Sequence, residues 1–464
     1  MTRVVVVGAG PAGLAAAEAA LRAGAEVTVL DQSDAPGGQY HRTLYGARQP
    51  GFEKLLERCD WWPESTVWAL EATPCAVGDP GAASCAAGVA GAGDPAAGAP
   101  GAGSQGVRLR IHVLRGPADG SGRERHTLEP DALILATGAH DRTLPFPGWQ
   151  LPGVFTAGAA QALAKGERVA VGKRVLVAGA GPFLLPVAES LLGVGVEVAA
   201  VLETNPAATV LKGWGLHPRK AGELARYAAT LVRHRVPYHL GRTVVEARGD
   251  DRVREVVTAR VRADWSVVPG TERTYAVDAV CVGHGFTPQP ELAVAAGCVL
   301  DGGFVQVDEH QRTSATRVFA AGEITGIGGA DAARAEGAVA GWAAAGGTPG
   351  RALLRERDRT RRFAHRLKTA HPIGAAWHGW LRDDTIVCRC EETSYGELKS
   401  AVADPVTPGP HALKLGTRAG LGPCQGRMCG PTVAELCGGT ERHHRPIAQP
   451  IRLGELADPK ETPA

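Results

Sequence analysis

The 464-residue chain lacks several features that would indicate particular classes of protein. Its formal net charge is only +2, so it has no basic field suited to wrapping nucleic acid, and we expect no nucleic-acid partner. No stretch is long and apolar enough to span a bilayer, so any membrane contact is expected to be peripheral. Ten cysteines are too few and too scattered for a disulfide framework, and charged residues interrupt the first apolar run, which argues against an export signal. These absences predict a cytoplasmic globular protein.

The chain opens with a glycine-rich turn between a strand and a helix. The run "RVVVVGAGPAG" is β-branched as far as Gly8, the helix-forming "LAAAEAALRAG" follows, and "EVTVLD" ends at Asp31. Gly8 permits a tight turn, Gly10 lets the backbone approach a pyrophosphate, and Gly13 lets the helix pack on the strand. Asp31 is placed to accept hydrogen bonds from ribose hydroxyls. This βαβ unit predicts a dinucleotide site.

A diverged copy of this unit begins at "KRVLVAGAGPFLLPVAESLLGVGVEVAAVLE". Gly179 and Gly181 repeat the first two glycines, but Leu184 replaces the third, which should push the helix from the strand or require local repacking. Glu203 ends the next strand, and an acid there favours a free 2′-hydroxyl over the 2′-phosphate of NADP. Two interpretations stay open: this site binds NAD or another adenine nucleotide, or the fold is retained without binding NADH.

Three shorter segments, "APGGQYHR", "ILATGAH" and "VFAAGEITG", resemble motifs of the two-dinucleotide-domain reductases. In that superfamily the corresponding segments approach FAD, so the resemblance implies FAD at the first site. Glu323 stands where the superfamily usually has Asp; it is one methylene longer, and we expect it still to reach a ribityl hydroxyl. The residues to which the resemblance assigns FAD contacts are Gly38, Gln39, Thr137, Gly138, Gly322 and Glu323.

Four cysteines near the C-terminus, Cys388, Cys390, Cys424 and Cys429, form a C-x-C pair followed by a C-x4-C pair. Thiolates grouped in this way bind either zinc or an iron–sulfur cluster, but zinc sites usually use C-x2-C knuckles. The glycine-rich "GLGPCQGRMCG" can present backbone N–H groups to the sulfurs, which stabilises a cluster. The spacing favours [2Fe–2S] over zinc or unliganded cysteines. Cys437 lies outside this set, and the cysteines outside it form no C-x2-C or C-x4-C pair for disulfide-reductase chemistry.

Together these patterns predict an α/β fold with two nested Rossmann-like dinucleotide-binding domains and a small C-terminal iron–sulfur domain. The Ala-, Gly- and Pro-rich residues 73–106 are expected to be a disordered insertion. Residues 350–380 are arginine-rich and have a helical pattern. This pattern favours a solvated linker helix with an apolar underside over a basic docking patch. The predicted parts are an FAD-binding domain at 1–165 with a return segment at 276–348, a second nucleotide-binding domain at 166–275, the linker at 349–383, the [2Fe–2S] domain at 384–440 and a tail at 441–464.

Outside the insertion, the chain resembles the FAD-containing alpha subunits of heteromeric bacterial amine and imino-acid dehydrogenases, the group of opine oxidase, D-hydroxyproline dehydrogenase and hydrogen cyanide synthase. The marks of this resemblance are "GGQYHR", "PGWQLPGVFTAGAAQAL", "GAGPFLLPVA", "RPIAQPIRLGELA" and a cysteine segment similar to bacterioferritin-associated-ferredoxin-like domains. It implies FAD at the first site and [2Fe–2S] on the four cysteines. It also implies a flavin-bearing beta subunit that oxidises the substrate C–N bond, and it allows a small ferredoxin-like subunit as a further partner.

A flavin accepts two electrons and releases them singly, whereas the cluster carries one, so this pair suits electron transfer from amine oxidation to a one-electron route. No acid–base pair stands out, and the lone histidines His140, His284 and His310 receive no catalytic role. Two alternatives stay open. The first is a stand-alone NADH-dependent reductase of ferredoxin or quinone, against which Leu184 weighs. The second is a non-catalytic iron–sulfur scaffold, against which the FAD motifs weigh.

Overall fold

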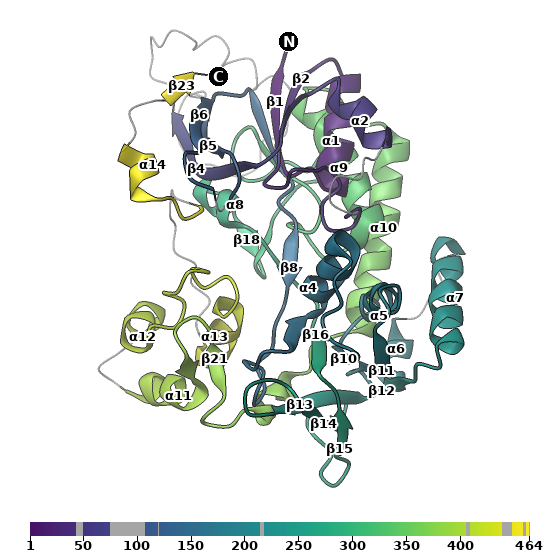
Figure 1. Cartoon of the computed structure of the whole chain (residues 1–464). Coiled ribbons are helices and arrows are strands. Elements are labelled where there is room, and N and C mark those ends of the chain that lie inside the picture. The colour runs from purple at the N-terminus through teal and green to yellow at the C-terminus, as the bar shows by residue number, and fades with distance from the viewer. Residues whose placement is uncertain are drawn as a thin grey trace, which may run out of the picture.

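Two α/β domains, one above the other in Figure 1, are accompanied by a smaller C-terminal domain. The computed structural model describes residues 1–42, 50–74, 107–118, 120–213, 218–404, 409–438, 448–457 and 461–463. Of the predicted insertion at 73–106, only Thr73 and Pro74 are described, and they end a strand; the rest lies outside the described residues.

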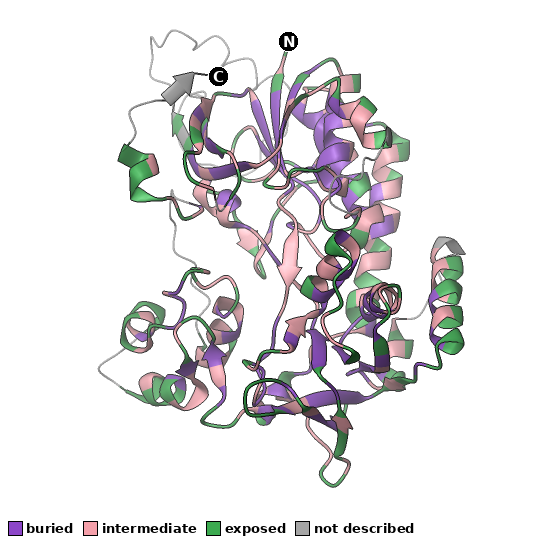
Figure 2. Ribbon diagram, in the orientation of Figure 1, coloured by how far each residue is buried: buried purple, intermediate pink, exposed green. Residues whose placement is uncertain are grey.

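The first domain is built on a five-stranded parallel sheet in the order β20-β7-β1-β2-β3. Four successive valines of β1 (Arg3–Val7) are buried, since both faces of this strand are covered, and Figure 2 shows the buried strands and helices of this layer. Helix α1 packs tightly on α9, because a Cβ on Gly337 would lie 2.0 Å from the carbonyl oxygen of Ala12. The other elements of this layer are α1 (Pro11–Arg22), β2 (Glu26–Leu30), α2 (Pro50–Leu56), β3 (Asp60–Trp62), β7 (Ala132–Leu135), β20 (Val318–Ala320) and α9 (Gly329–Ala344).

A four-stranded sheet in the order β23-β6-β5-β4 joins the chain's C-terminal segment to the first domain. Arg123 donates to both carboxylate oxygens of Glu455, at 2.7 and 2.8 Å, and both side chains are almost fully buried. The described parts of the predicted tail therefore pack on the first domain. The elements here are β4 (Ser65–Pro74), β5 (Val107–Arg115), β6 (Glu124–Leu128), α8 (Glu291–Ala295), β18 (Leu300–Asp301), β19 (Phe304–Val305), α14 (Leu453–Ala457) and β23 (Glu461–Pro463).

The second domain has a parallel sheet in the order β12-β11-β10-β16-β9. Strands β9 and β16 lie outside the predicted range 166–275, so the domain extends beyond that range at both ends. The reason is that β10 pairs with β16, which follows the separate antiparallel sheet β13-β14-β15 along the chain. The elements are β9 (Val154–Thr156), α4 (Ala157–Ala162), η1 (Leu163–Glu167), β10 (Arg174–Gly179), α5 (Leu184–Leu192), β11 (Glu197–Glu203), α6 (Ala207–Lys212), α7 (Pro218–Arg233), β12 (Tyr238–Leu240), β13 (Arg242–Arg248), β14 (Glu255–Arg260), β15 (Arg273–Ala276) and β16 (Ala279–Gly283).

Two connections run between these domains. The first is an antiparallel ribbon of β8 (Ala139–Asp141) and β17 (Phe286–Pro288). The second is the long helix α10 (Arg351–Ala370), which lies beside both domains in Figure 1 and is followed by the 3-10 helix η2 (Ala375–Trp380). The helix is present where the linker was predicted, but it is not simply solvated. Its polar residues Arg357 and Thr360 are buried, because this side of the helix packs against the first domain.

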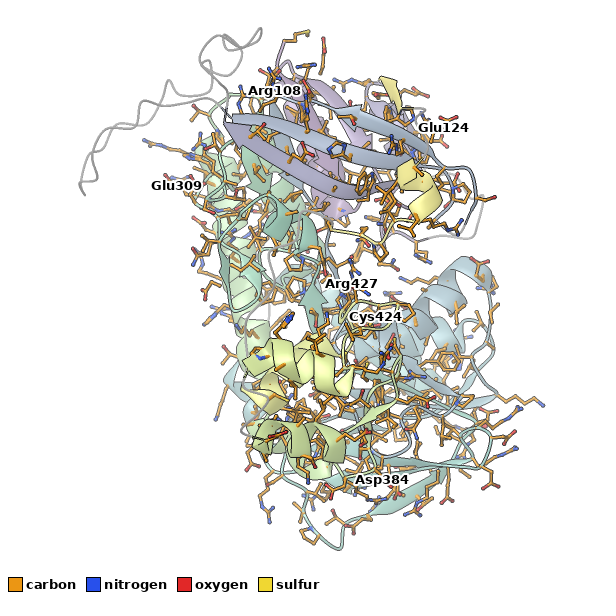
Figure 3. All side chains as sticks on the ribbon, turned by 90° about the vertical axis from the view of Figure 1, so that its left-hand side faces the viewer. Arg108, Glu124, Glu309, Asp384, Cys424 and Arg427 are labelled. Atoms are coloured by element: carbon orange, nitrogen blue, oxygen red, sulfur yellow. The ribbon has the colours of Figure 1, made fainter. Side chains whose placement is uncertain are left out.

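The C-terminal domain contains short strands and three helices around a small core that includes Val387, Leu398 and Leu413. Helix α11 begins with a capping box between Ser394 and Glu397, which fixes its N-terminus. Figure 3 shows Cys424 and Arg427 of this domain at the height where the two larger domains meet. Across the described ranges, no helix combines the length and apolar character needed to cross a bilayer. The elements are β21 (Ile386–Cys388), β22 (Thr393–Ser394), α11 (Tyr395–Ala403), α12 (Gly409–Thr417) and α13 (Gly430–Cys437).

Candidate functional site

A large cavity reaches both glycine-rich turns. Its volume is about 3450 Å³, which exceeds the roughly 300–1,000 Å³ typical of pockets for one small ligand and leaves room for a dinucleotide. Of the predicted cofactor-binding residues, Gly13, Gly179 and Glu203 do not line it. Those that do are Gly8, Gly10, Asp31, Gly38, Gln39, Thr137, Gly138, Gly181, Gly322 and Glu323.

The three glycines of the first turn have three different surroundings. Gly8 has a φ of +106°, and a Cβ there would lie 2.3 Å from the carbonyl oxygen of Ala136. A Cβ on Gly13 would lie 1.7 Å from the carbonyl oxygen of Gly8, so helix and strand touch there. At Gly10 a Cβ would meet nothing within 4 Å, because its backbone faces the cavity. This arrangement fits a turn that holds a pyrophosphate at a helix N-terminus.

Asp31 braces this turn and still faces the cavity. Its Oδ2 accepts a hydrogen bond from Ala9 N at 2.6 Å, and its Oδ1 accepts one from Ser33 N at 2.8 Å. A carboxylate offers about four acceptor positions, so two remain beyond these contacts. Asp31 therefore retains the capacity to accept ribose hydroxyls.

Gly37 and Gly38, of the segment "APGGQYHR", lie directly on the first glycine-rich turn. Gly37 N donates to Ala9 O at 2.8 Å, and a Cβ on Gly38 would lie 3.0 Å from Gly10 Cα. Gly38 has a φ of +58°, a conformation that glycine adopts readily. The fold thus brings Gln39, the next residue, to the same cavity.

The remaining two predicted FAD segments also border the cavity. Thr137 Oγ1 donates to Gln289 O at 2.7 Å, and Gln289 N donates to Gly138 O at 3.0 Å, which fixes this loop against the segment after β17. Burial raises the pKa of Glu323, although a backbone N–H of Gly329 partly opposes the shift. Glu323 is thus a half-buried carboxyl that lines the cavity.

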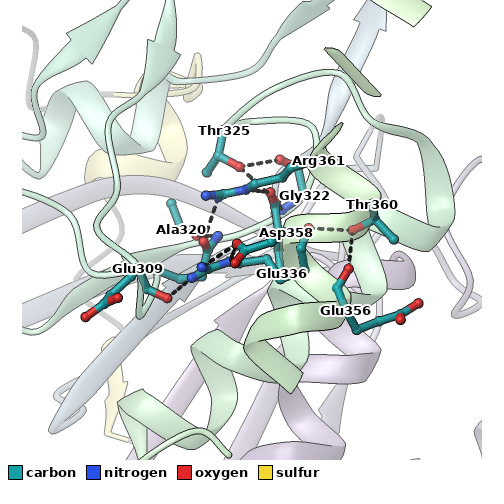
Figure 4. A network of polar contacts seen from close by, with 11 residues as sticks. Glu309, Ala320, Gly322, Thr325, Glu336, Glu356, Asp358, Thr360 and Arg361 are labelled. Carbon is teal, nitrogen blue, oxygen red and sulfur yellow. Dashed lines mark hydrogen bonds and ion pairs between the residues drawn. The ribbon is translucent and has the colours of Figure 1, made fainter. Parts of the chain in front are cut away.

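A polar network that sequence reasoning missed holds the loop of Gly322 (Figure 4). Glu336 of α9 accepts hydrogen bonds from Gly322 N and Thr325 Oγ1, both at 2.9 Å, on one carboxylate oxygen. Its other oxygen accepts from Arg361 of α10 at 2.6 Å, and Arg361 also donates to Gln311 at 2.7 Å. The available signal was a single buried acid in an alanine-rich helix, which requires a partner.

The second glycine turn differs from the first in where its helix begins. Gly179 repeats the tight strand contact, because a Cβ there would lie 1.7 Å from Gly283 O. Helix α1 begins at the residue after Gly10, whereas α5 begins at Leu184, three residues after Gly181. Leu184 is buried in the domain core, so local repacking accommodates the missing glycine.

Glu203 does not reach the cavity, contrary to what its predicted role requires. It is fully buried. Its Oε1 accepts from the backbone N and the Nδ2 of Asn205, both at 2.9 Å, while its Oε2 accepts from Gly181 N at 2.8 Å. His371 Nδ1 lies 3.1 Å from the same Oε2. The acid therefore serves internal contacts.

The four predicted cysteine ligands come together as two pairs. Cys429 neighbours Cys388, and Cys390 neighbours Cys424; burial and these neighbouring thiols raise the pKa of Cys429 and of Cys390. Cys388 and Cys429 are buried, whereas Cys390 is exposed. No set of three or more His, Cys, Asp or Glu side chains in the described ranges has the arrangement of a metal-ion site. Two neighbouring thiol pairs nevertheless match the donor set of a two-iron cluster, which takes four thiolates.

The loop around Cys424 supplies the backbone donors that a cluster requires. Burial raises the pKa of Cys424, but the backbone N–H groups of Met428, Gly426 and Arg427, together with the neighbouring Cys390 thiol, outweigh this effect, and the net shift is downward. A Cβ on Gly422 would lie 2.3 Å from the Cβ of Cys390, so only glycine fits there. These features fit the predicted stabilisation of sulfur by a glycine-rich loop.

This cysteine-bearing loop lies against the strand that leaves the Thr137–Gly138 segment. His140 Nε2 of β8 lies 3.1 Å from Arg427 O, between Cys424 and Cys429 in sequence. Thr432 Oγ1 donates to Thr143 O at 3.2 Å. No role was assigned to His140 from the sequence. Its contact with Arg427 O forms only because the C-terminal domain packs against β8.

Glu435 of α13 fastens this contact. It forms an ion pair with Arg142, which follows β8, and accepts a hydrogen bond from Trp377 Nε1 at 2.9 Å. Trp149 Nε1 also donates to Ile386 O, at the start of β21. The C-terminal domain is thus tied at several points to the segment after the second FAD motif.

Residues 2–337 match the family model described as pyridine nucleotide-disulphide oxidoreductase. The chain belongs to this oxidoreductase family. Residues 386–437 match the model of the BFD-like [2Fe-2S] binding domain, which contains all four cysteines. The two matches show that the chain carries FAD and a [2Fe–2S] cluster and is an FAD-dependent oxidoreductase, as predicted.

Curated relatives confirm the predicted subgroup of the family. The chain is 31% identical to the A subunit of opine oxidase from Agrobacterium tumefaciens (strain Ach5), over 98% of this chain and 91% of that protein. It is 30% identical to hydrogen cyanide synthase subunit HcnB of Pseudomonas aeruginosa, over 92% of this chain and 90% of that protein. The oxidoreductase thus belongs with these subunits.

Solved structures confirm the fold class. L-proline dehydrogenase from P. horikoshii superposes with a TM-score of 0.61 at 19% identity, covering 98% of this chain and 79% of that one. Thioredoxin reductase from T. acidophilum gives a TM-score of 0.52 at 21% identity, covering 75% of this chain and 99% of that one. At these identities the likeness concerns the fold of the oxidoreductase alone.

Proposed function

We propose that this chain is the electron-transfer subunit of a complex that oxidises the C–N bond of an amine, amino acid or imino acid. A flavin-bearing beta subunit oxidises the substrate, and a small ferredoxin-like subunit is a further partner. The support is that the relatives spanning most of the chain carry the names of subunits of opine oxidase and hydrogen cyanide synthase.

The observation that carries this proposal is the contact between His140 and Arg427 O. It places the cysteine loop against β8, which begins directly after Gly138 of the second FAD segment. When bound, FAD supplies two-electron chemistry and the cluster carries single electrons. The chain itself positions the predicted FAD segment and the cysteine loop at β8. The ion pair of Arg142 with Glu435 keeps the C-terminal domain in place.

The contacts of the C-terminal domain disfavour the non-catalytic iron–sulfur scaffold, because a scaffold does not require a cluster that is fixed beside a predicted FAD segment. The NADH-dependent reductase alternative has a specific basis, since the second glycine turn and Gly181 border the cavity. The full burial of Glu203 weighs against it.

An anaerobic titration tests the proposal. The purified chain, alone and together with the products of neighbouring genes, is titrated with NADH and then with glycine, proline, hydroxyproline and opines while visible and electron paramagnetic resonance spectra are recorded. We expect an amine to reduce the flavin and the cluster only when the partner is present. Rapid flavin bleaching by NADH in the chain alone would overturn the proposal in favour of the reductase.

A matched pair of variants separates electron transfer through the cluster from reduction of the flavin. Cys429→Ser removes a predicted cluster ligand, whereas Cys437→Ser changes a half-buried cysteine outside the set. We expect the first to uncouple substrate oxidation from a one-electron acceptor and the second to behave as wild type. Equal coupling in both would mean that electrons do not pass through the cluster.

A further inference from the structure

Two acids occupy equivalent places in the two dinucleotide folds. Asp31 directly follows β2, and Glu203 is the last residue of β11. In folds of this kind the acid at this place accepts hydrogen bonds from the adenosine ribose. The two differ in access, since Asp31 lines the cavity whereas Glu203 does not and has an exposed fraction of 0%.

Counting hydrogen-bond capacity sharpens the difference. A carboxylate can accept about four hydrogen bonds. Glu203 has four nitrogens within hydrogen-bond distance, two from Asn205, one from Gly181 N and one from His371 Nδ1. Asp31 has two such partners. Glu203 therefore has no position left for a ribose hydroxyl.

The fold holds His371 over Glu203. His371 is the residue after α10, whose last turn lies directly on the end of α6. A Cβ on Gly213 would lie 2.2 Å from Arg366 O and 2.6 Å from the Cβ of Ala370, so no side chain separates the two helices. The backbone just before His371 is therefore fixed against α6, and this places the His371 ring beside Glu203.

Asn205, on the other side of Glu203, is equally confined. Its Oδ1 accepts a hydrogen bond from Trp265 Nε1 at 3.1 Å. Trp265 is fully buried and stacks on Trp380 at 5.8 Å between ring centroids, and Trp380 Nε1 donates to Trp265 O at 3.0 Å. Trp380 belongs to the same linker as His371, so one segment restrains both neighbours of the acid.

We propose that His371 closes the second dinucleotide site by occupying the acceptor position that an adenine-nucleotide ribose requires. NADH and other adenine nucleotides with a free 2′-hydroxyl are therefore excluded from the second dinucleotide site. His371 is thus a specificity-determining residue, and the second domain supports the chain without taking a cofactor. The inference concerns binding alone and does not depend on which substrate the complex oxidises.

Calorimetric titration of the FAD-loaded full chain with ADP-ribose and with NADH tests this inference, because bound FAD fills the first site. We expect the wild-type chain to show no saturable binding up to about 1 mM nucleotide. His371→Ala frees an acceptor position on Glu203 and should gain binding at least about tenfold tighter than that limit. His234→Ala, which changes an exposed histidine that does not line the cavity, should behave as wild type.

Two results would overturn the proposal. The first is saturable binding to the wild-type chain that Glu203→Gln abolishes, a measurement that requires no substitution at His371. The second is a folded His371→Ala chain, with normal FAD content, that binds no better than wild type. Neither result bears on amine-dependent reduction with the partner, so this inference and the proposed function fail separately.

Discussion

Arg361 Nε lies 2.6 Å from Oε1 of Glu336, an ion pair that joins α10 to α9 beside the Gly322 loop, which is predicted to contact FAD. Glu336 is buried, and its other oxygen holds Gly322 N and Thr325 Oγ1. Removing one partner of a buried pair leaves an uncompensated charge, which is costly. The linker helix is therefore part of the support for the cofactor site, as well as a connection to the C-terminal domain.

Arg361→Ala should weaken FAD retention by about tenfold or more, because Glu336 then loses its partner and the Gly322 loop loosens. The measurement is the equilibrium release of FAD, followed by its fluorescence, in wild type and variant. Arg362→Ala is the control, since Arg362 is exposed on the same helix turn. Equal FAD release from Arg361→Ala and the control would refute the role of the ion pair.

Glu435→Gln should loosen the C-terminal domain, because the carboxylate loses its charge and the Arg142 guanidinium is left with only a hydrogen bond to a neutral amide. Glu435 is outside the cysteine set, so the cluster should be retained. After photoreduction of the flavin, we expect cluster reduction in the variant to be several-fold slower, together with faster hydrogen exchange in residues 139–143. Glu392→Gln, at an exposed position of the same domain, is the control. An unchanged rate would show that this ion pair does not position the domain.

Cys429→Ser should abolish the cluster, because it removes one thiol of the buried Cys388–Cys429 pair. Iron and acid-labile sulfide per chain and the visible spectrum measure this loss. Cys437→Ser should keep both iron and sulfide at the wild-type level. Full cluster content in Cys429→Ser, or its loss in Cys437→Ser, would mean that the ligand set is assigned incorrectly.

His284 should make the fold sensitive to acid. Burial, with a smaller contribution from Arg142, lowers the pKa of His284 from 6.5 to about 3. Between these pH values the unfolded chain binds a proton that the folded chain does not, so the free energy of unfolding falls as the pH drops below 6.5. At pH 5.5 this contribution amounts to a loss of about 1.4 kcal/mol.

Urea unfolding at pH 7.5 and pH 5.5 checks this expectation. His284→Leu should show a smaller loss of stability between the two pH values than wild type, whatever its absolute stability. His234→Gln alters an exposed histidine and should show the wild-type difference. The same pH difference in His284→Leu as in wild type would exclude His284 as the source.

Several site residues could be predicted because their roles depend on neighbours close in sequence. The conformations of Gly8 and Gly10 follow from one strand–turn–helix unit, and Cys388 with Cys390 needs only one short strand and its turn. Glu203 shows the limit of this reasoning. Its position at a strand end was predicted correctly, but its availability depends on His371, which lies far along the chain.

The sequence by itself determined the fold class, the FAD motifs and the cysteine set, because backbone conformation and ligand type are properties of short segments. Tertiary structure alone decided that Glu336 and Arg361 brace the Gly322 loop, that the cysteine loop lies on β8, and that Glu203 is enclosed. These are pairings between segments far apart in sequence. Their hydrogen bonds form only after the sheets, helices and C-terminal domain have packed, so no local pattern encodes them.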